Sequence, residues 1–512
     1  VLRIIPGVIY KQVNVIFSTG KKNREYFISN GVNKNKIVWI FLCLMFGGIS
    51  YAQNLSLTLD QVIALSVETN DYEILKSDSL ITQYNNKIFR LKVLPKFSLT
   101  ATLPNFNNSI SPVTLPDGSE RYINRFYSSA NMGINISQLV PFTGGTLSLS
   151  STLNRLDNFN PTRNQSYSLT LLNFSYSQKI SGFNQYKWEK KLHLIQRDID
   201  IIKQIQQREI IKEKAIRLFF DLYEEQHRLE LNQFILSLTQ FVYERSKKLY
   251  EEKKISELDF LESEIEYHKA QNNNNTIAIS QARQKLKDFL NIKSNEDLFV
   301  VYTPSVLYDY NFDFNPQQVI DRAIEFTTDI SRKFEKVQNE MKLKELTLES
   351  KPSVSLSIGG GINSQANSLA SIMDAKSNRI NIMLSFSIPF LNWGANKTNR
   401  LIFKENIRKS DLEYENSKQE YLSNFQHDLE YIHVLRSSIL EDLKLNELLR
   451  KKIDLLKMNV HYGKVDITKI IQAEKQLVQN ELRYIVNIKN LYLIIYKFRT
   501  VSLIDLRNNS IV

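Results

Sequence analysis

The chain has 512 residues and a formal net charge of +12, with Lys and Arg distributed along the same stretches as Asp and Glu. No cluster of cationic residues with interleaved aromatic residues is found, so the basic balance indicates solvated helix faces rather than a nucleic-acid surface. The only cysteine, Cys43, lies in an apolar run, which excludes a disulfide framework and a thiolate metal site.

That apolar run, IVWIFLCLMFGGISYAQ, follows two lysines and ends in Ser-Tyr-Ala. A basic start, a short apolar core and small residues before the cleavage point are typical of a secretory signal peptide, here cleaved after Ala52. The run is shorter than the roughly 20 residues of a transmembrane helix. We therefore expect residues 1–52 to be leader and signal peptide, and we interpret residues 1–31 as preceding a translation start at Val32.

After the signal peptide, a helical pattern gives way to alternation of apolar and polar residues, which is typical of half-buried or membrane-facing strands. The helical pattern begins at Gln61 and ends at Pro95, and the alternation begins at Phe97 with FSLTATL. The segment PFTGG (141–145) is predicted to be a hairpin turn, and SPVTLPDGSERY (111–122) an exposed loop. Further strands within 96–180 are predicted at residues 132–140, 146–153 and 167–177.

A very long helix is predicted from about Lys187 to Tyr250, where apolar residues recur at three-, four- and seven-residue spacing without any proline or glycine. Such a helix would measure roughly 95 Å at about 1.5 Å per residue, which no ordinary globular domain needs. A turn near residues 250–258 and a shorter helix complete a first structural repeat, predicted to span residues 53–292.

The second half repeats the plan of the first. The stretch QVIDRAIEF at Gln318 aligns without a gap with QVIALSVET at Gln61, and the alignment places Pro352 on Pro95. A second very long helix is predicted from about Asn396 to Val460. The other predicted boundaries are an inter-repeat segment at 293–315, a second repeat at 316–503 with strands within 353–390 and a hairpin tip near 460–468, and a tail at 504–512.

The predicted strands are too few to close a membrane barrel within one chain. At most about six are predicted, whereas about eight are needed for the smallest membrane barrels. An open sheet edge in lipid would leave backbone groups unpaired, at several kcal/mol each. If the strands lie in a membrane, several chains must share one barrel, and the Ser and Asn residues on the inner face imply a water-filled lumen.

Four features of the sequence carry a family resemblance: the opener LTLDQVIALSVETN (57–70), the proline before KFSLTATLPNFN, the two strand-to-helix junctions SGFNQYKWEKKL (181–192) and PFLNWGANKTNRL (389–401), and the paired helix turns. In their order and duplication the chain resembles the TolC family of outer membrane efflux proteins, over essentially all of the mature chain. One departure is the number of alternating segments in the first half, which exceeds the two strands that the family leads one to expect. Residues 104–165 are therefore either an extracellular insertion or an added hairpin.

The resemblance implies a mainly α fold with a membrane β-barrel portion, in which a shared transmembrane barrel of a homotrimer stands on a long periplasmic α-helical barrel. It implies a location in the bacterial outer membrane with a large periplasmic portion. The implied partners are the other chains of the trimer, a periplasmic adaptor (membrane fusion protein), an inner-membrane pump reached through the adaptor, and outer-membrane lipid, with no nucleic acid.

The function implied by the resemblance is a passive exit duct of a tripartite efflux or type I secretion system. Small toxic molecules and unfolded polypeptides both stay open as cargo. The alternative from another functional class is a soluble periplasmic coiled-coil scaffold without a pore.

The two turns that follow the very long helices align with each other, YEEKKISELDFLESE (250–264) with VHYGKVDITKIIQAE (460–474). In the family these turns are the tips at which the adaptor docks. Glycine accepts the positive φ of a tight turn between helices, which explains the presence of Gly463 in the second turn. The first turn has Lys253 at the equivalent position. Ser256 and Asp466 are predicted to cap the helices that leave the turns. The adaptor-contact residues implied by the resemblance are Lys253, Lys254, Ile255, Ser256, Gly463, Lys464, Val465 and Asp466.

The periplasmic entrance of the duct is expected just beyond these turns. Many family members place two carboxylates after the second tip, but this chain has Lys469 and Gln472 there, while Asp259 and Glu262 hold the equivalent positions in the first half. Any acidic ring at the entrance is therefore predicted to come from the first half alone.

No catalytic chemistry is predicted. The six histidines show neither the spacing of metal ligands nor an HExxH motif. The glycines at 359–361 lack a following Gly-Lys-Ser/Thr and are interpreted as a strand end or loop, and no Gly-x-Ser-x-Gly motif is present. We therefore expect neither an enzyme nor a cofactor or metal site.

Overall fold

The computed structural model describes residues 55–180, 182–272, 276–293, 297–303, 316–374, 376–461, 467–505 and 510–511. The predicted leader and signal peptide (1–52) lies outside these residues. The same holds for residues 462–466, which include Gly463 and the rest of the second predicted turn.

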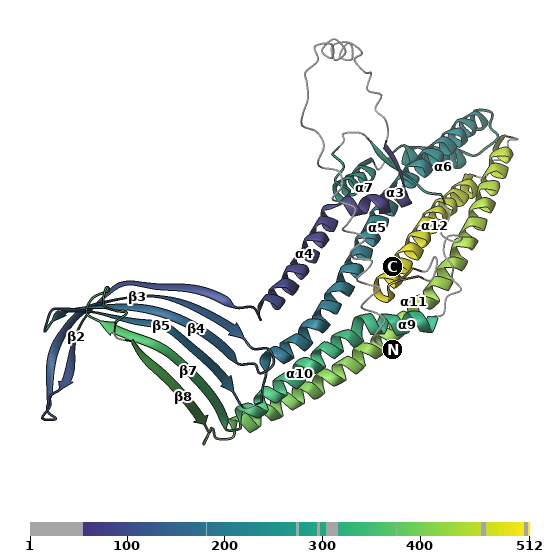
Figure 1. Ribbon diagram of the computed structural model, residues 1–512. Coiled ribbons are helices and arrows are strands. Elements are labelled where there is room, and N and C mark those ends of the chain that lie inside the picture. Colours follow the sequence, from purple (N-terminus) through teal and green to yellow (C-terminus); the bar gives the residue numbers. More distant parts are fainter. Residues whose placement is uncertain are drawn as a thin grey trace, which may run out of the picture. The chain divides into compact units, whose positions relative to one another are not determined.

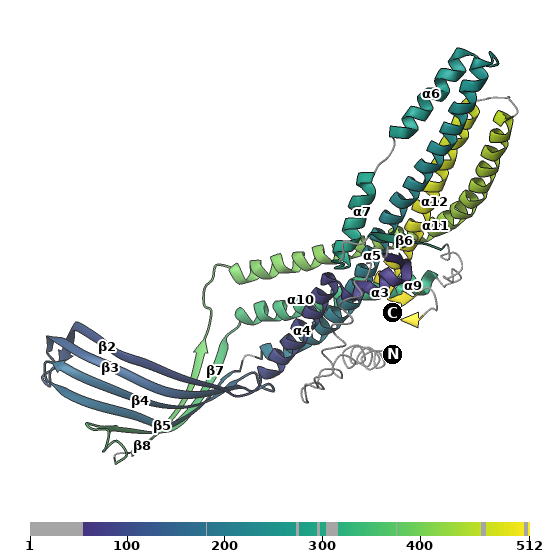
Figure 2. The same ribbon diagram turned by 90° about the horizontal axis from the view of Figure 1, so that it is seen from above.

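Helices make up most of the described residues (Figures 1 and 2). The elements of the first half are β1 (Leu55–Thr58), α3 (Leu59–Leu65), η1 (Ser66–Glu68), α4 (Asn70–Leu91), β2 (Lys96–Thr114), β3 (Glu120–Leu139), β4 (Thr146–Asn160), β5 (Asn164–Lys179), α5 (Gln185–Glu251), α6 (Glu257–Asn272), α7 (Thr276–Phe289) and β6 (Leu298–Val301). Those of the second half are α9 (Pro316–Ile324), η2 (Glu325–Asp329), α10 (Ile330–Glu349), β7 (Ser353–Ala366), β8 (Lys376–Ser387), α11 (Ala395–His461), α12 (Ile467–Ser502), β9 (Ile504–Asp505) and β10 (Ser510–Ile511). In both halves, helices precede strands, and a very long helix follows them.

The two predicted long helices are confirmed, and each is 67 residues long. At about 1.5 Å per residue, α5 and α11 each extend roughly 100 Å. α5 begins where the Asn184 side chain accepts a hydrogen bond from the backbone N–H of Lys187 (3.0 Å), which satisfies one of the unpaired N–H groups of the first turn.

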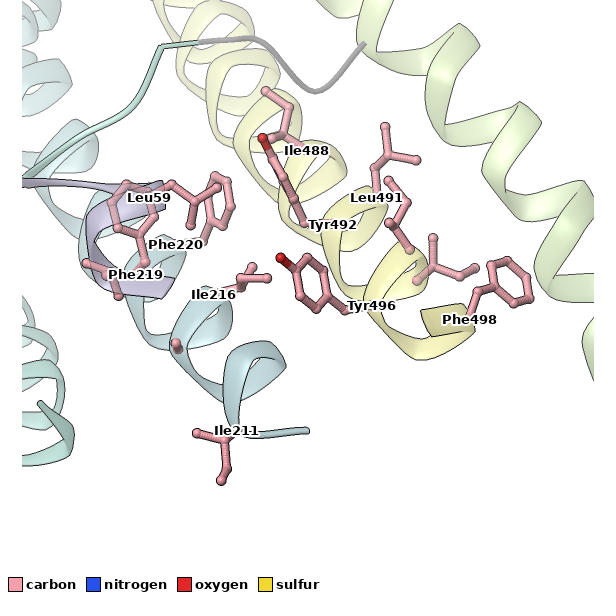
Figure 3. Packing of buried hydrophobic residues seen from close by; sticks show 14 of the residues in the cluster. Leu59, Ile211, Ile216, Phe219, Phe220, Ile488, Leu491, Tyr492, Tyr496 and Phe498 are labelled. Carbon is pink, nitrogen blue, oxygen red and sulfur yellow. The ribbon is translucent and has the colours of Figure 1, made fainter. Parts of the chain in front are cut away.

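The main core lies where the two halves meet, between α5 and α12 (Figure 3). Phe219 and Phe220 on α5 are fully buried, and the ring of Phe220 lies 5.5 Å from that of Tyr492 on α12. The short strands β1 and β6 pair in parallel beside this core, and Leu298 in β6 is fully buried. Apolar burial of this kind joins chain segments that are far apart in sequence.

The largest sheet in the described part of the chain is six-stranded and antiparallel, in the order β2-β3-β4-β5-β7-β8 (Figure 1). Strands β5 and β7, from opposite halves, pair from Tyr167 with Ala366 to Lys179 with Ser355. Four of the six strands come from the first half. Residues 104–165 therefore belong to the strands of this sheet, from the end of β2 through β3 and β4 to the start of β5, rather than to a separate insertion. The turn at PFTGG is confirmed, with Gly144 at φ 77°.

The exposed loop predicted at residues 111–122 is wrong. β2 continues to Thr114 and β3 begins at Glu120, so only the residues between them turn. Pro112 pairs with Tyr122, which is possible because β2 is an edge strand, where a missing N–H does not break a ladder.

The interpretation of the three glycines at 359–361 as a strand end or loop is also wrong, because they lie in the middle of β7. A Cβ atom on Gly361 would lie 2.4 Å from the carbonyl oxygen of Leu172. The glycine is needed because β5 bulges between Thr170 and Leu172 and its backbone comes close to β7.

Candidate functional site: a two-faced sheet and a helical tip

One face of the six-stranded sheet is polar from edge to edge. Residues paired across antiparallel strands point to the same face, so the register gives the composition of each face directly. The polar rows are Ser137–Ser148–Ser175–Gly359–Asn381, Ser98–Asn135–Ser150–Asn173–Gly361–Arg379, Thr100–Gly133–Thr152–Thr170–Asn363–Ser377 and Thr102–Asn131–Asn154–Ser168–Gln365. These rows span about 20 Å along the strands at about 3.4 Å per residue.

The opposite face is predominantly apolar. Its rows include Phe97–Ile136–Leu149–Phe174–Gly360–Ile380 and Leu147–Tyr176–Ile358–Ile382. Many of these side chains are exposed in the single chain, with Ile380 at 81% and Phe97 at 74% of their full exposure. An exposed apolar surface that continues from strand to strand in this way marks contact with a membrane or another protein.

Both edges of this sheet end on exposed strands. All residues of β8 and nearly all of β2 are exposed, and each of these strands has a sheet neighbour on one side only among the described residues. Long exposed edges of this kind can pair with further strands. The sheet therefore has the form of a segment that other strands can extend on both sides.

The helical tip of the first half lies between α5 and α6, at the predicted adaptor-contact residues. Lys253 has φ 59°, in the left-handed region that glycine normally occupies. The Lys253 N–H donates to the carbonyl of Tyr250 (2.8 Å) and the Lys254 N–H to that of Leu249 (2.8 Å). These two bonds form a Schellman motif, so the lysine takes the position that the sequence comparison assigns to glycine.

The predicted cap at Ser256 is confirmed. The Asp259 N–H donates to Ser256 Oγ (3.1 Å), and the N–H and hydroxyl of Ser256 both donate to Asp259 Oδ2 (3.3 and 2.6 Å). This reciprocal pair is a capping box at the start of α6. The Asp259 carboxylate, predicted at the duct entrance, is thus engaged in holding the turn.

The remaining predicted site residues fall in three groups. Lys254 is exposed, and Ile255 and Glu262 are half-buried, all on the first tip. Lys469 and Gln472 are exposed on α12. The other tip residues, Gly463, Lys464, Val465 and Asp466, lie outside the described residues.

Replacing Lys253 with glycine should stabilise the first tip by about 1 kcal/mol, because it removes the steric cost of a left-handed residue that carries a side chain. The measurement is the denaturant dependence of helix loss in the purified protein. Lys254→Gly is the matched control, since Lys254 is not among the residues with positive φ and the change should be neutral or destabilising. Equal effects of the two variants would contradict the strain at Lys253.

A small cavity of about 10 Å³ lies between α5, α6 and α12, in the same hairpins as the tip, and sequence reasoning missed it. It is lined by Thr239, Val242, Ser263, Glu266, Ile470, Ile471 and Glu474. Glu474 is 9% exposed, and its Oε2 has no hydrogen-bond partner among the described residues. The sequence signal that could have revealed the burial of Glu474 is its spacing, four residues after Ile470 and three before Leu477. Both of these residues are buried, so helical periodicity puts the Glu474 carboxylate on the apolar stripe of α12.

Burial, followed by the negative charge of Glu266, raises the pKa of the Glu474 carboxyl to about 7, although Lys475 acts in the opposite direction. In the unfolded chain this pKa lies near 4.5, so the folded state binds the extra proton between these two values. The packing of α12 against α5 and α6 should therefore strengthen as pH falls from 8 to 5, by roughly 2–3 kcal/mol at most.

Hydrogen exchange of the α12 amides around Glu474 measures this pH dependence. Glu474→Gln, which cannot ionise, should remove most of it, whereas Glu264→Gln on α6 should leave it in place. Wild-type pH dependence that persists in Glu474→Gln would show that another group is responsible.

No group of three or more His, Cys, Asp or Glu side chains in the described part of the chain is placed to hold a metal ion. None of its helices is both long and apolar enough to span a membrane.

No protein-family model and no curated protein matches the chain, but solved structures match its fold. The Campylobacter jejuni outer membrane channel CmeC is 13% identical, with a TM-score of 0.60 over 94% of each chain. The outer membrane protein VceC of Vibrio cholerae is 9% identical, with a TM-score of 0.59 over 87% of this chain and 95% of VceC. The Neisseria gonorrhoeae MtrE outer membrane channel in its open state is 14% identical, with a TM-score of 0.52 over 87% of this chain and 88% of MtrE. The predicted mainly helical fold with an attached sheet is thereby confirmed for the single chain.

Proposed function

We propose that this chain is an outer-membrane exit duct of the TolC family, a passive homotrimeric channel that an inner-membrane pump uses through a periplasmic adaptor. The observation that carries the proposal is the two-faced sheet, with four polar rows on one side and exposed apolar rows on the other. Polar residues facing a lumen and apolar residues facing lipid, alternating along each strand, are the pattern of a transmembrane barrel wall.

The open edges of the sheet explain why the proposed duct needs several copies of the chain. Six strands cannot close a membrane barrel, but β2 of one copy can pair with β8 of the next and leave no backbone edge in lipid. Three six-stranded sheets would supply eighteen strands. A barrel of 16–18 strands encloses an aqueous channel.

The helices give the proposed duct its periplasmic portion. α5 and α11, each roughly 100 Å long, are sufficient to extend far from the membrane. The tip between α5 and α6 presents Lys253, Lys254 and Ser256 as exposed residues, and we assign it, with the residues of the second turn, to adaptor contact. Asp259, Glu262, Lys469 and Gln472 are assigned to the periplasmic entrance. We propose no enzymatic activity for this chain.

The alternative, a soluble periplasmic scaffold, leaves the apolar face unexplained, because that face extends across all six strands and is exposed in the single chain. Cell fractionation separates the two functions. An exit duct should be recovered from the outer membrane as a detergent-stable trimer that dissociates on heating. Recovery of the whole protein in the soluble periplasmic fraction would rule the duct out.

A further inference from the structure

The polar face of the sheet carries positive charge and no negative charge. Among the described strand residues its charged side chains are Lys96, Arg121, Arg125, Lys179 and Arg379. The six strands contain only two acidic residues, Glu120 and Asp157. Both lie on the opposite face by register, since Asp157 pairs with Ser128 and Glu120 is one residue from Arg121.

The five cations are available to solutes. All five residues are exposed, and none takes part in an ion pair among the described residues. The contrast is Arg155 on the opposite face, whose guanidinium is neutralised by Asp157 (2.9 Å) and stacks on Tyr167. The positive charge of the polar face is therefore uncompensated within the strands.

The residues around these cations do not neutralise their positive charge. The polar rows next to Arg379 consist of Ser, Thr, Asn and Gly, which are neutral. The acidic side chains of the turns beside the strands are Asp117, which accepts hydrogen bonds from Ser119, and Asp374, and neither lies on the strands. In a narrow aqueous space, cationic side chains raise the local concentration of anions, and rings of Arg and Lys are the usual lining of anion-conducting pores.

We propose that the strand-built section of the duct selects for anions, so that the favoured solutes of this channel are anionic. This inference rests on the proposed function, because it needs the polar face to enclose a lumen. Three copies of the chain would place five uncompensated cations each on that lumen. A neutral or cationic solute would gain nothing from them.

Reversal potentials across planar bilayers in a KCl gradient test the proposal with the purified full-length trimer. The double variant Arg125→Gln/Arg379→Gln should lower the ratio of Cl⁻ to K⁺ permeability by about twofold or more, since it removes two of the five charges in each chain. The matched control is Lys376→Gln, three residues from Arg379 and therefore on the opposite face of β8. The control should leave the ratio unchanged.

Tripolyphosphate supplies an independent reading in the same bilayers. Tripolyphosphate added to the chamber at the strand end of the trimer, opposite the helices, should reduce the wild-type current. The double variant should require a severalfold higher concentration for the same reduction. A permeability ratio that is the same in wild type and double variant, or that shifts equally in Lys376→Gln, would overturn the anion proposal. Absence of any conductance in all variants would instead overturn the proposed function itself.

Discussion

Ile382→Lys should abolish the trimer in the outer membrane. Ile382 lies on the apolar face of β8, in the row that contains Ile358 and Tyr176, and it is exposed in the single chain. A lysine on the lipid face of a membrane barrel costs about 2–4 kcal/mol near the middle of the bilayer, and a trimer would carry three of them. The measurement is the amount of heat-dissociable trimer in the outer-membrane fraction, which we expect to fall below detection.

Asn381→Lys is the matched control, because it places the same charge one residue away, on the polar face. That variant should assemble at wild-type levels. If both variants assemble equally well, the apolar face does not contact lipid and the assignment of the two faces fails.

Phe220→Ala should have the largest effect on the stability of the chain itself. Phe220 is fully buried, and its ring lies 5.1 Å from that of Tyr302 and 5.5 Å from that of Tyr492, so it joins both halves. Truncating a buried phenylalanine costs about 3–5 kcal/mol through lost apolar burial and the cavity left behind. Thermal unfolding followed by circular dichroism in detergent should show a lower Tm.

The control is Phe241→Ala on the same helix, where the side chain is 40% exposed. Because this exposure leaves less apolar surface to lose, Phe241→Ala should lower the free energy of unfolding by only about 1 kcal/mol or less. Comparable losses for the two variants would mean that the packing between α5 and α12 does not decide stability.

The long helices were the most predictable part of the fold. Their predicted ends at 187–250 and 396–460 lie within two residues of the observed ends of α5 and α11. The reason is local, because a stretch without proline or glycine that keeps helical periodicity has few alternatives. The strands were also predictable as alternating segments, but their lengths were not.

The predictions of strand ends were wrong where the position of a residue in the sheet overrode the local sequence signal. Pro112 indicates a loop when read alone, yet an edge strand tolerates it because no neighbour needs its N–H. Gly361 indicates a strand end, yet it is required inside β7 by the bulge of β5, which lies far away in the sequence. Neither pairing can be read from the residues next to these positions.

The tip was predictable in its chemistry and only partly in its geometry. The capping role of Ser256 follows from its spacing to Asp259. Lys253 was recognisable as a departure from glycine, but the sequence did not show that it keeps the left-handed conformation. The burial of Glu474 depends on the rotation of α12 against α5 and α6, which periodicity does not fix to a single residue.

Single-channel recording of the purified trimer in planar bilayers tests most directly whether the polar face of the sheet lines a continuous passage. We expect discrete conductance steps from the assembled trimer. These steps should be lost after heat dissociation, and they should be absent from the Ile382→Lys preparation. A stable trimer that inserts into the bilayer and shows no conductance at any voltage would show that the polar face does not line a passage.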